Sequence, residues 1–320
     1  MPAPIQQYGQ YGRPQGGAPT ICPMSENIPV NLYTIQKPLR AKTIENRRLT
    51  PSSENLRSDV RHITFRYQEK LPYRAGQSVG TLIPGIDPAT GKPHKLRLYS
   101  VASESIGDFG DDQTVSLCVV RHFWNNPKTG EKNVPGTASN YLCDLKVGDE
   151  IQLTGPVGKH FLLPADYQKR DLVFVATGTG IAPYRGMLKE MFKSGYQERV
   201  WLYFGVAYRD VVLYDDEFET YRKFKNFSYV KAISREEKNP IPEIVSTREN
   251  KMYVQVKMYQ DKNTLKDVLK KPDSIVYLCG LKGMEAGIFP VLENVGSELG
   301  KQDSFVAKLK AEQRLRVEVY

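Results

Sequence analysis

The spacing of apolar residues divides the chain into two parts. From about residue 30 to residue 164, apolar and polar residues alternate in short runs, as in residues 62–67 and 115–120. Turn-forming pairs such as Pro84-Gly85 and Pro135-Gly136 separate these runs. Because successive side chains of a strand point to opposite faces, alternation indicates strands with one buried face. Several short strands of this kind predict an antiparallel barrel.

After residue 170 the apolar residues form unbroken runs instead. Residues 172–176, 200–204 and 275–279 are apolar throughout, which is typical of strands buried on both faces. The residues at helical spacing that follow the first and third runs are Met187, Leu188, Met191 and Phe192, and Met284, Ile288, Leu292, Val295 and Leu299. Pro183 is placed to begin the first helix, whereas Pro290 should strain or kink the second. Strands that alternate with helices predict a parallel sheet, which binds ligands at the carboxyl ends of its strands.

These patterns divide the chain into three segments. Residues 1–27 are rich in Gln, Gly and Pro and cannot bury enough apolar surface to offset the entropy of ordering, so we predict a flexible arm. Residues 28–164 form the predicted antiparallel barrel domain, and residues 165–320 form the predicted α/β domain. A chain of 320 residues is long for one core, which agrees with two domains.

Charge and cysteine content narrow the class of protein. The formal net charge of +9 favours acidic partners. No run of Lys and Arg exceeds two residues and no zinc-finger or RNA-binding signature is present, so nucleic acid is disfavoured. No apolar run approaches the roughly 18 residues of a membrane span. The four cysteines are widely spaced and match no metal-ligand pattern, so we predict no metal site and a reducing compartment.

The first residues also bear on location. They show neither the apolar core of a signal peptide nor the Arg- and Ser-rich composition of an organelle transit peptide. We therefore predict a cytoplasmic protein, with a plastid location as the alternative.

The stretch Arg97-Leu98-Tyr99-Ser100 carries the first candidate chemistry. An arginine can bind a diphosphate with a bidentate fork, and a tyrosine can lie flat on a conjugated ring. A neighbouring serine hydroxyl can donate a hydrogen bond to a ring atom. A flavin dinucleotide has all three of these parts. The alternative is an ordinary amphipathic strand with an exposed arginine.

The second candidate is the turn Thr177-Gly178-Thr179-Gly180, which follows the first buried run. Glycines let backbone amides approach a phosphate, and a following helix presents its positive end. The third glycine of the full dinucleotide fingerprint is missing. The alternative is therefore a tight turn without a ligand.

Six motifs occur in an order that resembles plant-type (plastidic) ferredoxin–NADP reductase, from about residue 30 to the end of the chain. They are Arg97–Ser100, Gly136–Asn140, Gly155–Lys159, Gly178–Pro183, Cys279–Glu285 and Val317–Tyr320. The resemblance implies a six-stranded antiparallel barrel that binds FAD, followed by a five-stranded parallel sheet that binds NADP.

The resemblance also implies which residues bind FAD. The matching positions are Arg97, Leu98, Tyr99, Ser100, Cys118, Val119, Arg121, Trp124, Ser139 and Tyr320. It places Arg97 and Ser139 on the diphosphate, Tyr99 on the isoalloxazine and Ser100 near N5. Trp124 stands where the family usually has a tyrosine that stacks on adenine, and an indole keeps that stacking face.

A second set of positions matches NADP-binding residues of the family. They are Thr177, Thr179, Ser234, Arg235, Tyr253, Gln255, Cys279 and Gly280. The resemblance places Ser234 and Arg235 on the 2′-phosphate, which favours NADP over NAD because that dianion rewards a bidentate arginine. Residues 207–210, Ala-Tyr-Arg-Asp, depart from the Ser-rich stretch of the plant pattern. There Arg209 could add a phosphate contact and Asp210 could oppose one.

The resemblance assigns catalysis to Ser100, Cys279, Glu318 and Tyr320, with Cys279 beside the nicotinamide and Tyr320 flat on the flavin. It implies hydride exchange between NADP(H) and FAD, and single-electron exchange with ferredoxin or flavodoxin. Lys92 and Lys95 match positions that dock this acidic carrier. A diaphorase or a reductase for another redox system is the alternative enzyme, and a flavin-binding sensor module is the alternative without catalysis.

Overall fold

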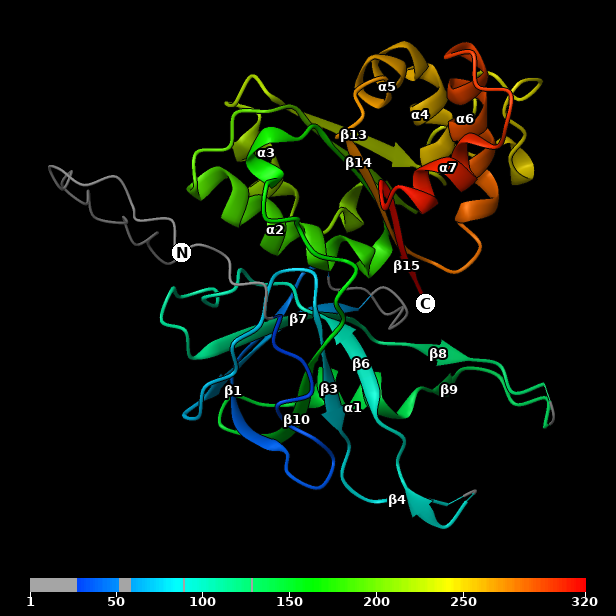
Figure 1. Ribbon diagram of the computed structural model, residues 1–320. Coiled ribbons are helices and arrows are strands. Elements are labelled where there is room, and N and C mark those ends of the chain that lie inside the picture. The colour runs from blue at the N-terminus through cyan, green and yellow to red at the C-terminus, as the bar shows by residue number, and fades with distance from the viewer. Residues whose placement is uncertain (1–27, 52–58, 89, 128) are drawn as a thin grey trace, which may run out of the picture.

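The computed structural model of the chain describes residues 28–51, 59–88, 90–127 and 129–320. The predicted flexible arm, residues 1–27, lies outside the described residues. Two sheets organise the described chain, one in each half of the sequence (Figure 1).

The first half forms a six-stranded antiparallel sheet in the order β6-β3-β10-β1-β2-β7. Its strands are β1 (Leu39–Arg48), β2 (Val60–Tyr67), β3 (Ser78–Leu82), β6 (Arg97–Ser100), β7 (Thr114–Val120) and β10 (Glu150–Val157). A bridge between Val101, directly after β6, and Leu117 of β7 joins the two edges and closes the sheet. The predicted six-stranded antiparallel barrel is confirmed.

Two small hairpins and one helix complete this half. The hairpins are β4 (Ile86–Asp87) with β5 (Lys92–Pro93), and β8 (Phe123–Trp124) with β9 (Val134–Pro135). Helix α1 (Thr137–Asp144) packs Leu142 and Cys143 into the barrel core. Every second residue of β7, namely Val115, Leu117 and Val119, lies in that core, which is the alternation that predicted the strand.

The second half forms a parallel sheet in the order β13-β12-β11-β14-β15, which confirms the predicted five strands. They are β11 (Leu172–Thr177), β12 (Val200–Val206), β13 (Phe227–Ile233), β14 (Ile275–Gly280) and β15 (Leu315–Val319). The helices are α2 (Ala182–Lys193), α3 (Asp215–Tyr221), α4 (Val254–Gln260), α5 (Lys262–Leu269), α6 (Glu285–Glu298) and α7 (Phe305–Ala311). Short 3-10 turns are η2 (Tyr167–Lys169), η3 (Gly178–Ile181), η4 (Arg209–Val211) and η5 (Arg248–Asn250).

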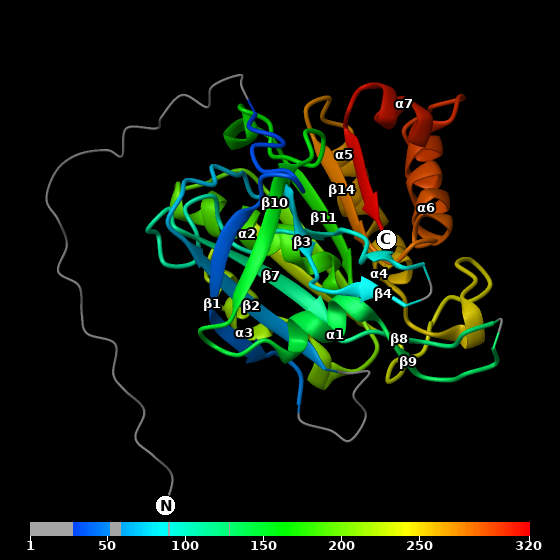
Figure 2. The same ribbon diagram turned by 90° about the horizontal axis from the view of Figure 1, so that it is seen from below.

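Helices cover both faces of the parallel sheet (Figures 1 and 2). Leu172 and Phe174 of β11 pack with α2 and α3, whereas the intervening Val173 and Val175 pack with α4 to α7. This two-sided burial explains why the strands are unbroken apolar runs. Helix α6 runs through Pro290 as a single element, and the strain expected there stays a prediction.

Helix α2 lies at the junction of the two halves (Figure 1). A Cβ on Gly186 would lie 2.3 Å from the carbonyl oxygen of Ser103, so only glycine lets the helix backbone come this close to the barrel. Ala75 and Ala102 of the barrel belong to the same apolar core as α2. The predicted domain boundary after residue 164 falls between β10 and β11 and stays a prediction.

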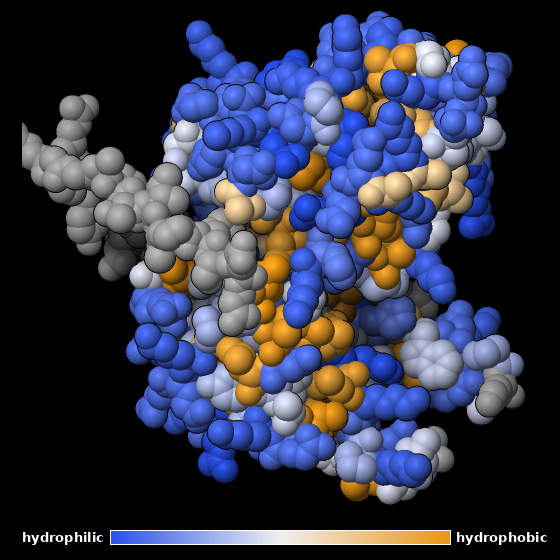
Figure 3. All heavy atoms as spheres, in the orientation of Figure 1, coloured by the Kyte–Doolittle hydropathy of each residue, from blue (hydrophilic) through white to orange (hydrophobic). Residues whose placement is uncertain are grey.

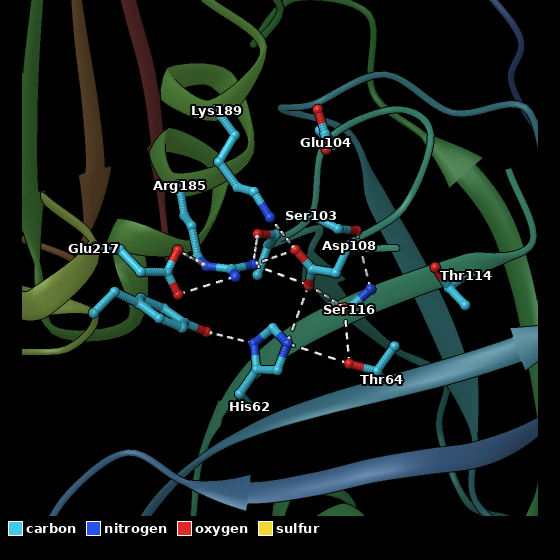
Figure 4. A network of polar contacts seen from close by, with 12 residues as sticks. His62, Thr64, Ser103, Glu104, Asp108, Thr114, Ser116, Arg185, Lys189 and Glu217 are labelled. Carbon is cyan, nitrogen blue, oxygen red and sulfur yellow. Dashed lines mark hydrogen bonds and ion pairs between the residues drawn. The ribbon is translucent and has the colours of Figure 1, made fainter. Parts of the chain in front are cut away.

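A buried polar network crosses this junction (Figure 4). Asp108, on a barrel loop, pairs with Arg185 and Lys189 of α2 at 2.8 and 2.7 Å. The same carboxylate accepts a hydrogen bond from Ser116 at 2.7 Å. The other side of the Arg185 guanidinium pairs with Glu217 of α3 at 2.8 Å. Each charge is therefore matched inside the junction, as burial requires.

His62 of β2 belongs to this network. Its Nε2 lies 3.1 Å from Asp108, and its Nδ1 lies 2.9 Å from the hydroxyl of Tyr214. A neutral ring with its proton on Nε2 satisfies both contacts, donating to Asp108 and accepting from Tyr214. Burial lowers the pKa of His62; the hydrogen bond to Asp108 opposes this effect and Arg185 adds to it. Burial would raise the pKa of Asp108, but His62, Arg185 and Lys189 hold it far below its usual value.

Candidate active site

A cleft of about 1030 Å³ separates the barrel from the carboxyl edge of the parallel sheet. Its volume lies at the upper end of the roughly 300–1,000 Å³ typical of small-molecule sites, so the ligand that fits is large. Figure 3 shows apolar side chains gathered along the middle of this side of the molecule, with the surface hollowed between the two halves.

Strand β6 forms one wall of the cleft. All four of its residues, Arg97 to Ser100, line the cavity. The sequence predicted two faces for this strand, and residues of both faces border the cleft. Strand β6 lies at the edge of its sheet and pairs along its length only with β3. Arg97 is exposed, and no carboxylate in the described part of the chain pairs with it. Burial raises the pKa of Tyr99, which therefore presents a neutral phenol.

The start of α1 forms a second wall. Gly136, Thr137, Ala138 and Ser139 line the cleft, and no side chain caps the first turn of the helix. The Ser139 hydroxyl accepts a hydrogen bond from the backbone N–H of His122 and donates to the carbonyl of Gly136. The free amides of a helix start favour an anion. Together with Arg97, this wall brings a positive charge and free amides to one side of the cleft.

Every second residue from 118 to 124 lines the cleft. Cys118 and Trp124 line the cleft, and the Trp124 indole is 41% exposed. Val119 points into the barrel core and is buried there. Arg121 pairs with Asp59 at 3.0 Å and with Asp144 at 2.8 Å, so its charge is already balanced. Val119 can therefore offer a ligand only its backbone, and the roles predicted for Val119 and Arg121 stay predictions.

The last strand brings Glu318 and Tyr320 into the cleft. The Tyr320 hydroxyl lies 2.6 Å from the Thr179 hydroxyl, and the Glu318 carboxylate accepts a 3.4 Å hydrogen bond from Ser78. Ser78 lies directly opposite Ser100 in the β3–β6 pair, so the structure places Glu318 near both serines. Burial raises the pKa of Glu318, and the hydrogen bond from Ser78 opposes that effect.

Cys279 lies at the end of β14, opposite Glu318 of β15, and is fully buried. The adjoining turn is tightly packed. A Cβ on Gly180 would lie 2.2 Å from the Cys279 carbonyl oxygen, and a Cβ on Gly280 would lie 2.1 Å from the Thr177 hydroxyl. That hydroxyl accepts a hydrogen bond from the backbone N–H of Leu281. These two glycines are therefore required by close approach between β11 and β14.

Nine predicted site residues do not line this cleft, and four of them, Ser234, Arg235, Tyr253 and Gln255, form a second group. Ser234 and Arg235 follow β13, and their backbone amides donate to the carbonyls of residues 206 and 207 at the end of β12. Residues 237–239 then pair with residues 250–252, which brings Tyr253 alongside the start of this segment. Gln255 of α4 packs against Gly287 of α6. The predicted site residues therefore fall into two groups, one lining the cleft and one beyond the end of β13, the edge strand of the parallel sheet.

Several cleft residues were missed by sequence reasoning. They are Ser78, Ile83, Asp87, His94 and His122. Ser78 is the most informative, since it stands 22 positions before Ser100 and only strand pairing brings the two together. Predicting that β3 and β6 pair, and which residues lie opposite one another, could have identified Ser78.

The fold and cleft define a two-domain reductase, in which a barrel binds a flavin dinucleotide and a parallel α/β sheet binds a nicotinamide dinucleotide. Residues 174–289 match the family model of the oxidoreductase NAD-binding domain. The chain is 41% identical over 302 residues to the ferredoxin–NADP reductase of the cyanelle of Cyanophora paradoxa, covering 92% of this chain and 80% of that protein. It is 42% identical over 305 residues to the chloroplastic enzyme of Mesembryanthemum crystallinum, with 93% and 80% coverage.

A solved structure gives the same result. The ferredoxin–NADP+ reductase of Plasmodium falciparum, solved with 2′P-AMP, superposes with a TM-score of 0.68 at 25% identity, covering 91% of this chain and 99% of that one. The chain belongs to the ferredoxin–NADP reductase family.

Proposed function

We propose that this protein is a ferredoxin–NADP reductase, an enzyme that uses FAD to exchange hydride with NADP(H) and single electrons with ferredoxin. The observation that carries this proposal is the cleft itself. It brings together a strand with Arg97, Tyr99 and Ser100, a helix start, and a terminal strand with Glu318 and Tyr320. These groups come from three distant parts of the sequence, and together they suit a large, conjugated, anionic ligand.

The residues present fit FAD. Arg97, without a carboxylate partner in the described chain, and the uncapped start of α1 at Ser139 suit the diphosphate. Tyr99 and Tyr320 offer aromatic faces for the isoalloxazine, and Trp124 offers one for the adenine. When bound, FAD supplies both hydride exchange and one-electron exchange. The protein supplies orientation, with Ser100 as a hydrogen-bond donor toward N5.

Tyr320, Cys279 and Glu318 have separate roles in this proposal. Tyr320 occupies the place that the nicotinamide ring needs, and the buried Cys279 becomes accessible when Tyr320 leaves. Glu318 places its carboxyl group near the serine hydroxyls, where burial raises its pKa. Tyr320 thus competes with the nicotinamide, which weakens ground-state binding and favours turnover.

The second group of residues serves NADP(H). The turn with Thr177 and Thr179 accepts the diphosphate, and Ser234 with Arg235 reads the 2′-phosphate. Tyr253 stacks on the adenine, assisted by Gln255. The position of these residues beyond the carboxyl ends of parallel strands supports this assignment. The relative from Plasmodium falciparum was solved with 2′P-AMP, a fragment that carries this phosphate.

The electron partner is an acidic carrier, ferredoxin or flavodoxin, that docks beside the cleft. Lys95 lines the cleft and Lys92 is exposed on the neighbouring β5, so both can meet a carrier there. The net charge of +9 favours such a partner.

The relatives also bear on location. No helix within the described residues is long and apolar enough to cross a membrane. The two relatives named above are enzymes of plastids, which favours the plastid alternative over the cytoplasm. Imaging a full-length fusion in the source cell tests this choice.

The deciding experiment is NADPH-driven reduction of cytochrome c, with and without added ferredoxin or flavodoxin. A reductase of this family requires the carrier for fast reduction of cytochrome c and reduces small acceptors without it. Fast reduction of small acceptors with no response to either carrier would instead indicate the diaphorase alternative. A protein that binds FAD and is not bleached by NADPH would indicate a sensor module.

A further inference from the structure

The stretch that departs from the plant pattern lies beside the proposed 2′-phosphate site. Tyr208 and Arg209 follow β12, and Arg235 follows the neighbouring β13. The backbone N–H of Arg235 donates to the carbonyl of Ala207 at 2.9 Å, which fixes the two segments side by side. A substitution in either segment can therefore change the position of side chains in the other.

Tyr208 supports the side chain of Arg235. The Arg235 guanidinium carbon lies 5.5 Å from the centre of the Tyr208 ring, and its Nη1 donates to the Tyr208 hydroxyl at 3.2 Å. No carboxylate in the described chain pairs with Arg235, so its remaining N–H donors are available. Tyr208 is 42% exposed, so its ring is accessible to the Arg235 guanidinium and can support it by a cation–π contact. The contact holds the guanidinium without neutralising it.

Arg209 acts on the two carboxylates that follow Arg235. Its Nη2 lies 3.1 Å from Glu237 and its Nε lies 3.7 Å from Glu236. Its backbone N–H also donates to Glu236 at 3.0 Å, and Lys257 approaches Glu237 at 3.3 Å. Both acidic side chains are thus held by cations other than Arg235. Arg209 is thereby engaged with carboxylates, and the phosphate contact suggested for it stays a prediction.

We propose that Tyr208 and Arg209 are specificity-determining positioning residues for the 2′-phosphate of NADP(H). Tyr208 keeps the Arg235 guanidinium extended toward the ligand, and Arg209 withdraws Glu236 and Glu237 from both Arg235 and the phosphate. This inference rests on the proposed function, because it takes Arg235 as the reader of the 2′-phosphate. In this proposal neither residue takes part in catalysis, and both act by positioning other side chains.

Electrostatics explains why the pair is needed. Two carboxylates directly after a phosphate-binding arginine would pair with it or repel a dianion across a few ångströms. A surface ion pair adds little stability by itself, so the gain lies in keeping Arg235 free. Holding the guanidinium in place also reduces the entropy lost when it forms two hydrogen bonds with phosphate.

The test measures binding of 2′-phospho-AMP and of 5′-AMP, together with kcat and KM for NADPH, in the holoenzyme. Tyr208→Ala should weaken 2′-phospho-AMP binding about tenfold, and Tyr208→Phe, which keeps the ring, about threefold. Arg209→Ala should weaken it about fivefold, more at low salt than at high salt, because uncovered carboxylates act through space. Binding of 5′-AMP and kcat at saturating NADPH should not change.

Rescue and a matched control separate positioning from a structural role. Adding Glu236→Gln to Arg209→Ala should restore most of the affinity, since the uncovered charge is removed. Arg222→Ala removes another surface arginine, which pairs with Glu219 on α3, and should leave both nucleotides unaffected. In a double-mutant cycle, Tyr208→Ala should add little once Arg235 is replaced by alanine.

Three results would overturn the inference. Equal loss of 5′-AMP and 2′-phospho-AMP would place Tyr208 on the adenosine or the fold. Tighter binding by Tyr208→Ala would show that the tyrosine withholds Arg235 from the ligand. Failure of Glu236→Gln to rescue Arg209→Ala would remove the role given to Arg209. If Arg235→Ala itself leaves 2′-phospho-AMP binding unchanged, the proposed phosphate site is wrong instead.

Discussion

Arg235 reads the 2′-phosphate in this proposal, so removing its guanidinium should separate the two nicotinamide nucleotides. Arg235→Ala should cost NADPH binding about 1.5–3 kcal/mol, the usual value of a hydrogen bond to a charged group. NADH has no 2′-phosphate, and its binding should hardly change. Dissociation constants for both nucleotides provide the measurement. Equal losses with NADPH and NADH would show that Arg235 has another role.

Tyr320 occupies part of the cleft and hydrogen-bonds Thr179. In the proposed function its ring competes with a nicotinamide. Tyr320→Ser should tighten nucleotide binding, because affinity is lowered by the fraction of time the ring is in place. Long-wavelength absorbance from a stacked complex should appear, turnover should slow, and discrimination against NADH should weaken.

Tyr320→Phe provides the matched control, since it keeps the ring and loses only the hydroxyl. It should behave much like the wild type in all four measurements. If Tyr320→Ser leaves affinity, absorbance and NADH activity unchanged, Tyr320 does not cover the nicotinamide site.

Residues within one strand were easier to predict than residues on paired strands. Arg97, Tyr99 and Ser100 are neighbours in sequence, and their spacing already suggested one ligand. Ser78 contacts Glu318, which lies 240 positions later in the sequence, and a local sequence pattern cannot predict a contact between such distant residues. The same holds for Tyr208, which stood out as a departure although its contact with Arg235 depends on the β12–β13 register.

At the scale of elements, Gly186 determines how closely α2 approaches the barrel. Alanine is a better helix former than glycine by about 1 kcal/mol. Against that gain, the added methyl would overlap the Ser103 carbonyl, and such overpacking typically costs about 1–3 kcal/mol. Gly186→Ala should therefore lower the melting temperature. Thermal unfolding of the holoenzyme measures the change, and a rise in melting temperature would show that the helix shifts freely.

The unbroken apolar strands of the α/β half were predicted almost to the residue, because burial on both faces leaves a simple pattern. Strand β1 gave a weaker signal. Its first residues alternate, with Leu39, Ala41 and Thr43 buried, but a bulge between Thr43 and Glu45 then shifts the register. An extra residue at a bulge interrupts the alternation of buried and exposed residues. Such a strand is therefore difficult to predict from the spacing of its apolar residues.

The junction between the domains should make the stability of the whole molecule depend on pH. His62 stays neutral in the fold because its pKa is lowered, whereas an unfolded chain binds that proton below about pH 6.5. Stability should therefore fall as the pH drops below about 6.5, by at most about 1.4 kcal/mol per pH unit. The lowered pKa of Asp108 acts in the same direction, and its contribution is lost at more acidic pH.

Urea unfolding between pH 5 and pH 8 measures this slope. His62→Gln should be less stable at pH 8 and should show a smaller slope below pH 6.5. His160→Gln changes an exposed histidine outside the junction and should keep the wild-type slope. An unchanged slope in His62→Gln would assign the pH dependence to other groups.

Net charge and partner docking also belong to the whole molecule. Reversing Lys92 and Lys95 to glutamate should slow ferredoxin-dependent turnover and flatten its salt dependence, while reduction of small acceptors persists. Reversing the exposed Lys223 and Lys225 changes the net charge equally, away from the cleft, and should have a smaller effect. Parallel loss of both activities would mean that the two lysines are structural or bind nucleotide.

The polar network at the junction has a consequence for recombination between relatives. A chimera made by joining two halves crosses over between β10 and β11, so a foreign barrel would meet Arg185 with its own residue in place of Asp108. A neutral residue there removes one of the two carboxylates that pair with the buried Arg185 guanidinium and leaves only Glu217, at a cost of up to about 3–5 kcal/mol. That is a large share of the 5–15 kcal/mol that typically holds a protein folded. The loop around Asp108 and the helix with Arg185, 77 positions apart, must therefore be inherited together.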